Sequence, residues 1–277
     1  MTFEAVSYES IPHALISGIA ISLLCSVVGL FLVLRKFSLF GDALAHSAFG
    51  GVAFGLFIGI YPLWIACAVA ILSALGLTKI RQKFDISGDA IVAILLSTGL
   101  GAGVILVSLT EDFEFHDIEE FLFGSAIVDT QNVVAILAMA GIILTILFFT
   151  YKKILYSTFS EEQAKASGIP VEKMSYLLIA MAGVTVVISM QLVGVLLISA
   201  LFVLPNVSAM LYARSFKQTV ILSMSFAVFA TVSGIIMSYQ FEIAQAGCIV
   251  LVAAAIFVGS LVAKGSGMVK TAGILAK

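Results

Sequence analysis

Long, unbroken apolar runs constrain this chain more than any other feature of its sequence. Hydrophobic residues make up 61% of its 277 residues, and charged residues make up only 11%. A soluble domain carries about 25% charged residues, so this chain lacks the charge that a water-facing surface requires. The runs are also too continuous for a membrane β-barrel, whose strands alternate apolar and polar residues. The composition therefore predicts an all-α, polytopic membrane protein and argues against a soluble enzyme.

The apolar runs supply enough length for nine membrane-spanning helices. A helix needs about 20 mostly apolar residues to cross a bilayer. The predicted spans are residues 13–34, 38–60, 63–78, 89–110, 131–151, 174–190, 193–213, 218–238 and 243–263. Some of these segments are short, so eight spans are an open alternative. No soluble domain and no long linker separates them, and we therefore predict a single transmembrane domain over residues 1–277.

Charged residues alternate in sign along the loops between the predicted spans. The basic clusters are Arg35 with Lys36; Lys79, Arg81 and Lys83; Lys152, Lys153, Lys165 and Lys173; Arg214 with Lys217; and Lys264, Lys270 and Lys277. The intervening loops hold acids instead, most densely over residues 111–120. Cytoplasmic loops of membrane proteins are enriched in Lys and Arg. The alternation therefore predicts an N-terminus outside the cell and a C-terminus in the cytoplasm.

The second predicted span holds an acid and a histidine, which are rare inside a bilayer. Asp42 and His46 are four residues apart, which places them on one helix face with Cβ atoms about 5–6 Å apart. An Asp at the centre of a membrane helix costs about 2.5–3.5 kcal/mol, so it usually faces a bundle interior or an aqueous path. Carboxylate oxygen and imidazole nitrogen suit Zn²⁺, Mn²⁺ or Fe²⁺. Three interpretations are open: a metal contact, a proton relay, and a pair that only joins helices.

Two further patterns concern the packing and the shape of helices. Ser47, Gly51, Gly55 and Gly59 recur at every fourth position on a neighbouring face of the second span. Such a series of small residues lets membrane helices approach closely, so we predict a helix-packing seam there. In the seventh span, Pro205 removes a backbone hydrogen bond, which predicts a kink.

A short helix is predicted in the loop between the fifth and sixth spans, over residues 160–170. Ser160 is a good N-cap, and Gln163 three residues later completes a capping-box pattern. Gly168 can end the helix in a left-handed cap, and Pro170 prevents it from restarting at once. The charge pattern places this helix on the cytoplasmic side.

Patterns typical of several enzymes and of nucleic-acid-binding proteins are absent from the sequence. No GxxxxGK(S/T) motif occurs, so the chain is not expected to bind ATP through a P-loop. No HExxH or GxSxG motif occurs either. The net charge of −2 gives no overall basic surface for nucleic acid. We therefore expect no enzymatic activity of the chain's own and no nucleic-acid partner.

Four stretches match motifs of one known family. Residues 38–47, SLFGDALAHS, are similar to a "GDALSHA" segment, and residues 162–168, EQAKASG, fit an "EAA-xxx-G" pattern. Residues 192–205, LVGVLLISALFVLP, are similar to a "VGxLLVxALLxxPA" run, and residues 121–125, FLFGS, to an "LFGS" turn. The chain thus resembles the membrane permeases of bacterial and archaeal ABC importers for zinc and manganese. It departs from the family at Gln163 and Asn206, where alanines are usual.

The resemblance implies a fold, partners and residue roles. The fold would be the importer type with many short, tilted helices, and two copies would form a path for Zn²⁺ or Mn²⁺ along their shared axis. Two ATPase subunits would dock on cytoplasmic helices, and an extracytoplasmic protein would deliver the metal at a prokaryotic cytoplasmic membrane. Asp42 and His46 would contact the ion, with no permanently bound cofactor. Glu162, Ala164 and Gly168 would form the coupling helix.

Two other functions are compatible with the residues alone. In an ion- or proton-coupled secondary transporter, Asp42 and His46 would carry protons, since histidine titrates near neutral pH. In a structural or assembly protein of the membrane, the same pair would only hold helices together. Zinc and manganese are not distinguished, because Asp and His can bind either ion.

Overall fold

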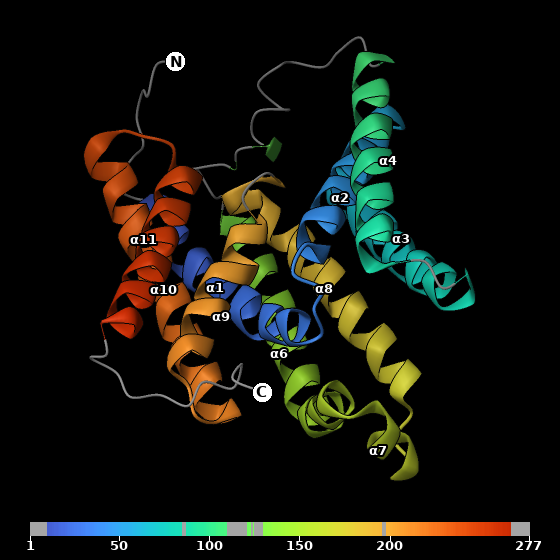
Figure 1. Cartoon of the computed structure of the whole chain (residues 1–277). Helices are drawn as coiled ribbons and strands as arrows, with labels where there is room; N and C mark the ends of the chain where they lie inside the picture. Colours follow the sequence, from blue (N-terminus) through green and yellow to red (C-terminus); the bar gives the residue numbers. More distant parts are fainter. Residues whose placement is uncertain are drawn as a thin grey trace.

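The computed structural model describes residues 10–84, 87–109, 121–122, 124, 130–195 and 198–266. Within these residues the protein is helical and holds no β-strand (Figure 1). The named helices are α1 (Ser10–Leu34), α2 (Phe40–Phe57), α3 (Pro62–Phe84), α4 (Gly88–Leu109), α6 (Thr130–Phe159), α7 (Glu161–Ala166), α8 (Val171–Val193), α9 (Ile198–Tyr212), α10 (Phe216–Phe241) and α11 (Gln245–Gly265). Each of the nine predicted spans coincides with one of these helices, and α7 is the predicted short one.

Seven of the helices are long and apolar enough to cross a membrane, namely α1, α3, α4, α6, α8, α10 and α11. The other two helices at predicted spans are less typical. Helix α9 has 15 residues, about 22 Å at 1.5 Å per residue, which is shorter than the hydrocarbon core of about 30 Å. Helix α2 has 18 residues and is interrupted by charged and small side chains. The all-α membrane fold predicted from the sequence is confirmed, with eight to nine spans.

Helices α1 and α8 form the centre of the bundle (Figure 1). In each of them 72% of the apolar stretch is buried, against at most 33% in the other five long spans. Helices α2, α3 and α4 pack together on one side of this centre, and α9, α10 and α11 pack on the other. Helix α2 also contacts α8 and α9, so the helix that carries Asp42 and His46 lies where the two groups meet.

The outer helices present large apolar side chains that are not covered by the rest of the chain. Phe148 and Phe149 on α6, Leu251 on α11 and Trp64 on α3 are each more than two-thirds exposed. In water such a surface would be unstable, whereas lipid solvates it without penalty. This exposed apolar surface accounts for the low charge of the chain.

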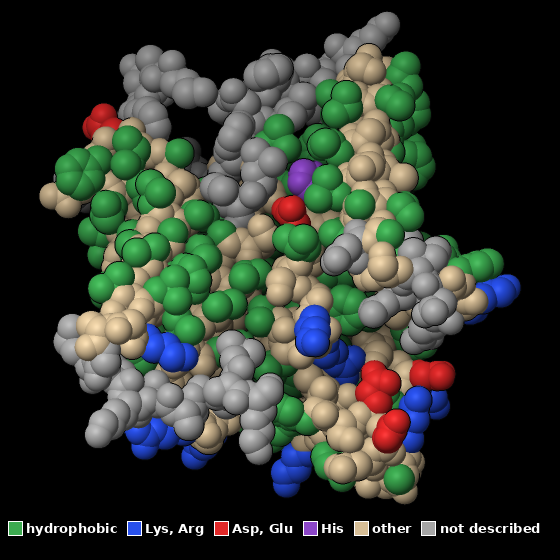
Figure 2. Space-filling model, viewed as in Figure 1, with side chains coloured by type: hydrophobic (Ala, Val, Ile, Leu, Met, Phe, Trp, Pro, Cys, Tyr) green, Lys and Arg blue, Asp and Glu red, His purple; other side chains and the backbone are tan. Residues whose placement is uncertain are grey.

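Lys and Arg side chains gather at one end of the molecule. Figure 2 shows them in the lower half of the visible face, the half in which α7 lies in Figure 1. Hydrophobic side chains cover much of the remaining face. The Lys and Arg side chains drawn on this face therefore lie at one end, as a membrane protein with one basic side requires. The acidic segment 111–120 lies outside the described residues.

Candidate functional site

The predicted seam on α2 packs against α3. The Ser47 hydroxyl donates a hydrogen bond of 2.8 Å to the Ser73 hydroxyl on α3. A methyl group added at Gly51 would lie 2.8 Å from the Cα of Ala66, also on α3. One added at Gly55 would lie 2.9 Å from the Cα of Pro62, the first residue of α3. Because atoms do not approach this closely without strain, the two glycines are what allow the helices to touch.

Gly59 does not extend this seam, and its assignment as a packing residue is wrong. Helix α2 ends at Phe57, and Gly59 follows it with φ of +72°. Its N–H donates to the carbonyl of Leu56, and the next N–H, of Ile60, donates to the carbonyl of Gly55. This is a Schellman cap, in which glycine takes the left-handed position. The prediction failed because the spacing of small residues at every fourth position continues past Phe57, where the helix ends.

A second close contact, on the α4 side of α2, was not predicted from the sequence. A methyl group at Gly99 on α4 would lie 2.6 Å from the carbonyl oxygen of His46. One at Gly50 would lie 2.8 Å from the carbonyl oxygen of Gly99. The sequence feature that could have indicated this contact is the run of alternate glycines at residues 99–103 in α4. It predicts a contact with α2 only once the pairing of these two helices is known. Helix α2 is thus held closely from both sides at the level of His46.

Asp42 and His46 lie together on α2 as their spacing predicts. The His46 Nε2 atom is 4.0 Å from the Asp42 Oδ1 atom, and the two side chains are 9% and 25% exposed. Asp42 lies in the first turn of α2, where the helix dipole favours a negative charge. The Nδ1 atom of His46 is buried and has no hydrogen-bond partner among the described residues. A buried imidazole nitrogen without a partner is unfavourable, and the ring nitrogen that faces Asp42 is the other one, Nε2.

The pair offers only two ligands to a metal ion. Among the described residues no group of three or more His, Cys, Asp or Glu side chains could hold an ion. Closed structural zinc sites use four ligands, and catalytic sites use three with an open position. Within the described part of one chain, the pair therefore supplies half of the ligands of a closed site, which is compatible with transient contact.

Helix α9 contains Pro205, next to a buried polar cluster. The Asn206 side-chain amide donates to the carbonyl of Phe202, one turn earlier, at 2.7 Å. Its side-chain oxygen accepts from Ser223 on α10, and the Ser223 hydroxyl lies 2.9 Å from the Ser26 hydroxyl on α1. The asparagine that departs from the family pattern therefore joins three helices beside the proline. The kink at Pro205 stays a prediction.

Helix α7 has both of the predicted caps. The Ser160 hydroxyl accepts from the N–H of Gln163, and Gly168 has φ of +76°. The Gly168 N–H donates to the carbonyl of Lys165, and the following N–H, of Ile169, donates to that of Ala164, which makes a second Schellman cap. The Ala164 side chain is fully buried. Glu162 is exposed in the first turn. Helix α7 is thus packed against the rest of the chain through Ala164 and is capped at both ends.

Residues 7–264 match the model of the ABC 3 transport family. The chain belongs to this family. It is 29% identical over 255 residues to the high-affinity zinc uptake system membrane protein ZnuB of Haemophilus influenzae, covering 92% of this chain and 97% of that protein. It is 32% identical over 255 residues to the manganese import system permease protein ScaB of Streptococcus gordonii, covering 91% of each.

A solved structure agrees with this family membership. The structure of PsaBC from Streptococcus pneumoniae in complex with a Fab superposes on this chain with a TM-score of 0.82. The sequence identity is 33%, and the match covers 90% of each chain. Similarity over this length means that the whole membrane domain, and not one motif, is shared. The resemblance inferred from four short stretches is therefore confirmed across the chain.

Proposed function

We propose that this chain is the membrane-spanning permease of an ATP-driven importer and forms the path for Zn²⁺ or Mn²⁺. Relatives named for zinc uptake and for manganese import support this assignment. The observation that carries it is the Asp42–His46 pair on α2, in which the His46 Nε2 atom lies 4.0 Å from the Asp42 Oδ1 atom. Cargo that binds oxygen and nitrogen ligands would satisfy both side chains.

The ion site would be completed by a second copy of the chain. Two Asp–His pairs brought together about a two-fold axis would offer four ligands, the number typical of zinc. Because each copy would contribute one Asp–His pair, separation of the copies would open the site and release the ion. An extracytoplasmic metal-binding protein would deliver the ion from outside.

Helix α7 would receive the movement of the ATPase. We place two ATPase subunits against the two copies of this helix, with Glu162 exposed at the contact, Ala164 anchoring the helix and Gly168 fixing its end. Support comes from the caps, the buried Ala164 and the position of α7 at the basic end of the molecule. The same charge pattern supports an N-terminus outside and a C-terminus inside, and the bacterial relatives support a prokaryotic cytoplasmic membrane.

Uptake by the reconstituted complex tests this function. The chain would be assembled with its ATPase in liposomes, supplied with a panel of divalent ions, and assayed with ATP or with a proton gradient. We expect ATP-dependent uptake of Zn²⁺ or Mn²⁺ that persists when the gradient is collapsed. Uptake that needs the gradient and ignores ATP would instead identify a proton-coupled secondary transporter.

A further inference from the structure

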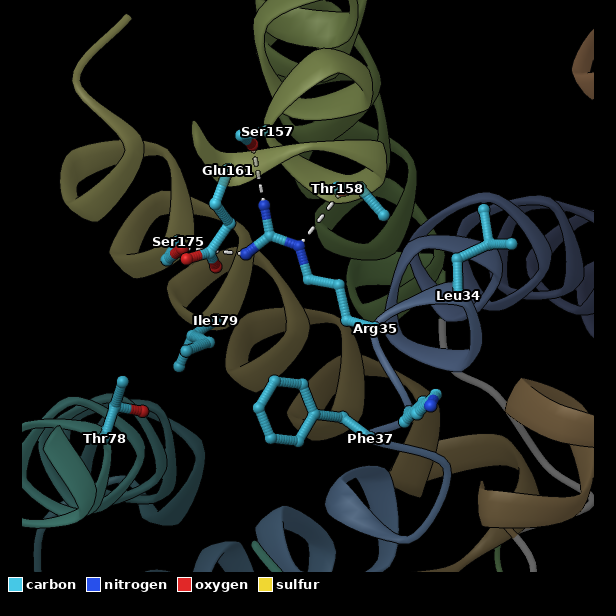
Figure 3. Close-up of a pocket in the computed structure, with 10 residues that line it drawn as sticks. Leu34, Arg35, Phe37, Thr78, Ser157, Thr158, Glu161, Ser175 and Ile179 are labelled. Atoms are coloured by element: carbon cyan, nitrogen blue, oxygen red, sulfur yellow. Dashed lines mark hydrogen bonds between the residues drawn. The ribbon is translucent and has the colours of Figure 1, made fainter. Parts of the chain in front are cut away.

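A polar cavity of about 480 Å³ lies beside α7, at the basic end of the molecule (Figure 3). Its walls come from the end of α1, from α3, α6 and α8, and from the first residue of α7. Its lining includes Arg35, Ser157, Thr158, Glu161 and Ser175. Arg35, which was assigned from the sequence only to a basic cluster, extends into this group of polar side chains.

The Arg35 guanidinium forms three hydrogen bonds to side chains of two other helices. It donates to the Ser157 hydroxyl at 2.8 Å and to the Thr158 hydroxyl at 3.0 Å, both in the last turn of α6. It also donates to the Ser175 hydroxyl at 2.8 Å, near the start of α8. Helix α7 lies directly between these two helices in the chain. One side chain of the α1–α2 connection therefore holds both ends of the segment that contains α7.

The acceptors of these bonds are themselves fixed. The hydroxyls of Ser157 and Thr158 donate their own hydrogens to the carbonyl of Ile154, which leaves their lone pairs for Arg35. Burial lowers the pKa of Arg35, and the nearby Glu161 carboxylate opposes that shift. Arginine side chains in proteins stay protonated. The three bonds of Arg35 are therefore charge-assisted hydrogen bonds, which are stronger than those between neutral groups.

The other side of Arg35 is connected rigidly to the helix that carries the ion ligands. Helix α1 ends in a Schellman cap at Lys36, which has φ of +62°. The Lys36 and Phe37 N–H groups donate to carbonyls of the last turn of α1, and the Phe40 N–H donates to the carbonyl of Phe37. Only residues 36–39 separate Arg35 from α2, and this connection is hydrogen-bonded. Asp42 is the third residue of α2.

We propose that Arg35 is a positioning residue that transmits movement of α7 to α2. It fastens the corner formed by α6, α7 and α8 to the turn between α1 and α2. When the ATPase moves α7, the guanidinium would draw this turn and the Asp42–His46 pair with it. This inference rests on the proposed function of α7 in coupling.

The test compares ATP hydrolysis with metal uptake in the complex of the full-length chain with its ATPase. Arg35→Lys keeps the charge and loses the planar fork that reaches three hydroxyls. Arg35→Gln removes the charge as well. Thr78→Val is the matched control, because Thr78 lines the same cavity but its hydroxyl donates within its own helix, to the carbonyl of Ala74. The probes are Zn²⁺ and Mn²⁺.

We expect both Arg35 variants to hydrolyse ATP at rates close to wild type and to transport roughly tenfold less metal per ATP. Thr78→Val should keep the wild-type ratio. A residue needed only for folding would lower hydrolysis and uptake together, so the ratio separates positioning from simple stability. A wild-type ratio in both Arg35 variants overturns the inference.

Two further variants keep the outcome decisive. If the Arg35 variants do not assemble, Ser175→Ala removes one of the three bonds and should lower the ratio on the order of threefold; an unchanged ratio there overturns the inference. Gly168→Trp, which strains the end of α7, tests the coupling function itself. If Gly168→Trp uncouples transport and the Arg35 and Ser175 variants do not, only the inference fails; if none uncouples, both fail.

Discussion

At the scale of single residues, the backbone of His46 packs closely against α4 because residue 99 of that helix is a glycine. Gly99 on α4 lets the two helix backbones approach at the level of His46, while Gly51 does the same toward α3. The Asp42–His46 pair, which we propose contacts the ion, is therefore carried by a helix with little freedom to shift sideways. A rigid support of this kind is what a site with few ligands needs, because its geometry must come from the packing around it.

Gly99→Ala is expected to destabilise the protein and displace His46. The added methyl group would lie 2.6 Å from the His46 carbonyl, and overpacking of this kind costs about 1–3 kcal/mol. Gly101→Ala is the control, since nothing lies within 4 Å of its position among the described residues. Thermal unfolding in detergent measures the effect. Equal midpoints for the two variants would show that α2 and α4 are not packed in this way.

Asn206→Ala is expected to lower stability by about 1–3 kcal/mol, because it removes the side-chain oxygen to which the buried Ser223 hydroxyl donates. Ser225→Ala on α10 is the control, since the exposed Ser225 hydroxyl donates within its own helix, to the carbonyl of Ile221. The same unfolding measurement compares them. If Asn206→Ala is as stable as Ser225→Ala, the polar cluster does not join α9 to α10.

At the scale of elements, the two short helical features show what local sequence determines. The caps of α7 follow from residues that are close in the chain, so Ser160 and Gly168 could be assigned without any tertiary information. The seam of α2 was also visible, but its partner was not, because only the fold brings Ala66 and Gly99 to opposite sides of that helix. Gly59 was misassigned since a spacing pattern does not show where a helix ends.

The three hydrogen bonds of Arg35 show the same limit more clearly. Its acceptors are more than 120 positions away in the chain, at Ser157, Thr158 and Ser175. Serine and threonine side chains are common in every predicted helix, and nothing in their local sequence distinguishes these three. Pairings of this kind depend on the packing of α1 against α6 and α8, which a single sequence does not reveal.

Replacing Gly168 tests the role of α7 at this scale. Its φ of +76° costs a residue with a Cβ about 1–2 kcal/mol, although no atom of the described residues lies within 4 Å of the position that this Cβ would take. Gly168→Ala should therefore lower the uptake of metal per ATP, and Gly168→Asn should lower it less, because asparagine tolerates the left-handed region. Hydrolysis and uptake in liposomes measure the ratio. The same uptake per ATP in the wild type and in the Gly168→Asn and Gly168→Ala variants would show that α7 does not couple hydrolysis to transport.

At the scale of the whole molecule, the end that holds the basic side chains should face the cytoplasm. The Lys and Arg side chains drawn in Figure 2 lie on the side of α7, although basic residues are scattered along the sequence. A tag inserted at residue 116 should be labelled from outside intact cells, and a tag at residue 166 only after permeabilisation. The reverse labelling would overturn the sidedness and the docking of the ATPase at α7.

The central claim, that Asp42 and His46 contact the transported ion, is tested most directly by metal uptake of their variants. Asp42→Asn keeps the shape and removes the charge, His46→Ala removes the imidazole, and His13→Ala is a control for loss of a histidine elsewhere. In complexes that assemble with the ATPase, we expect the first two to lose at least about tenfold in uptake of Zn²⁺ or Mn²⁺. The control should transport normally. Wild-type uptake by assembled Asp42→Asn and His46→Ala complexes would contradict the claim and make the pair structural.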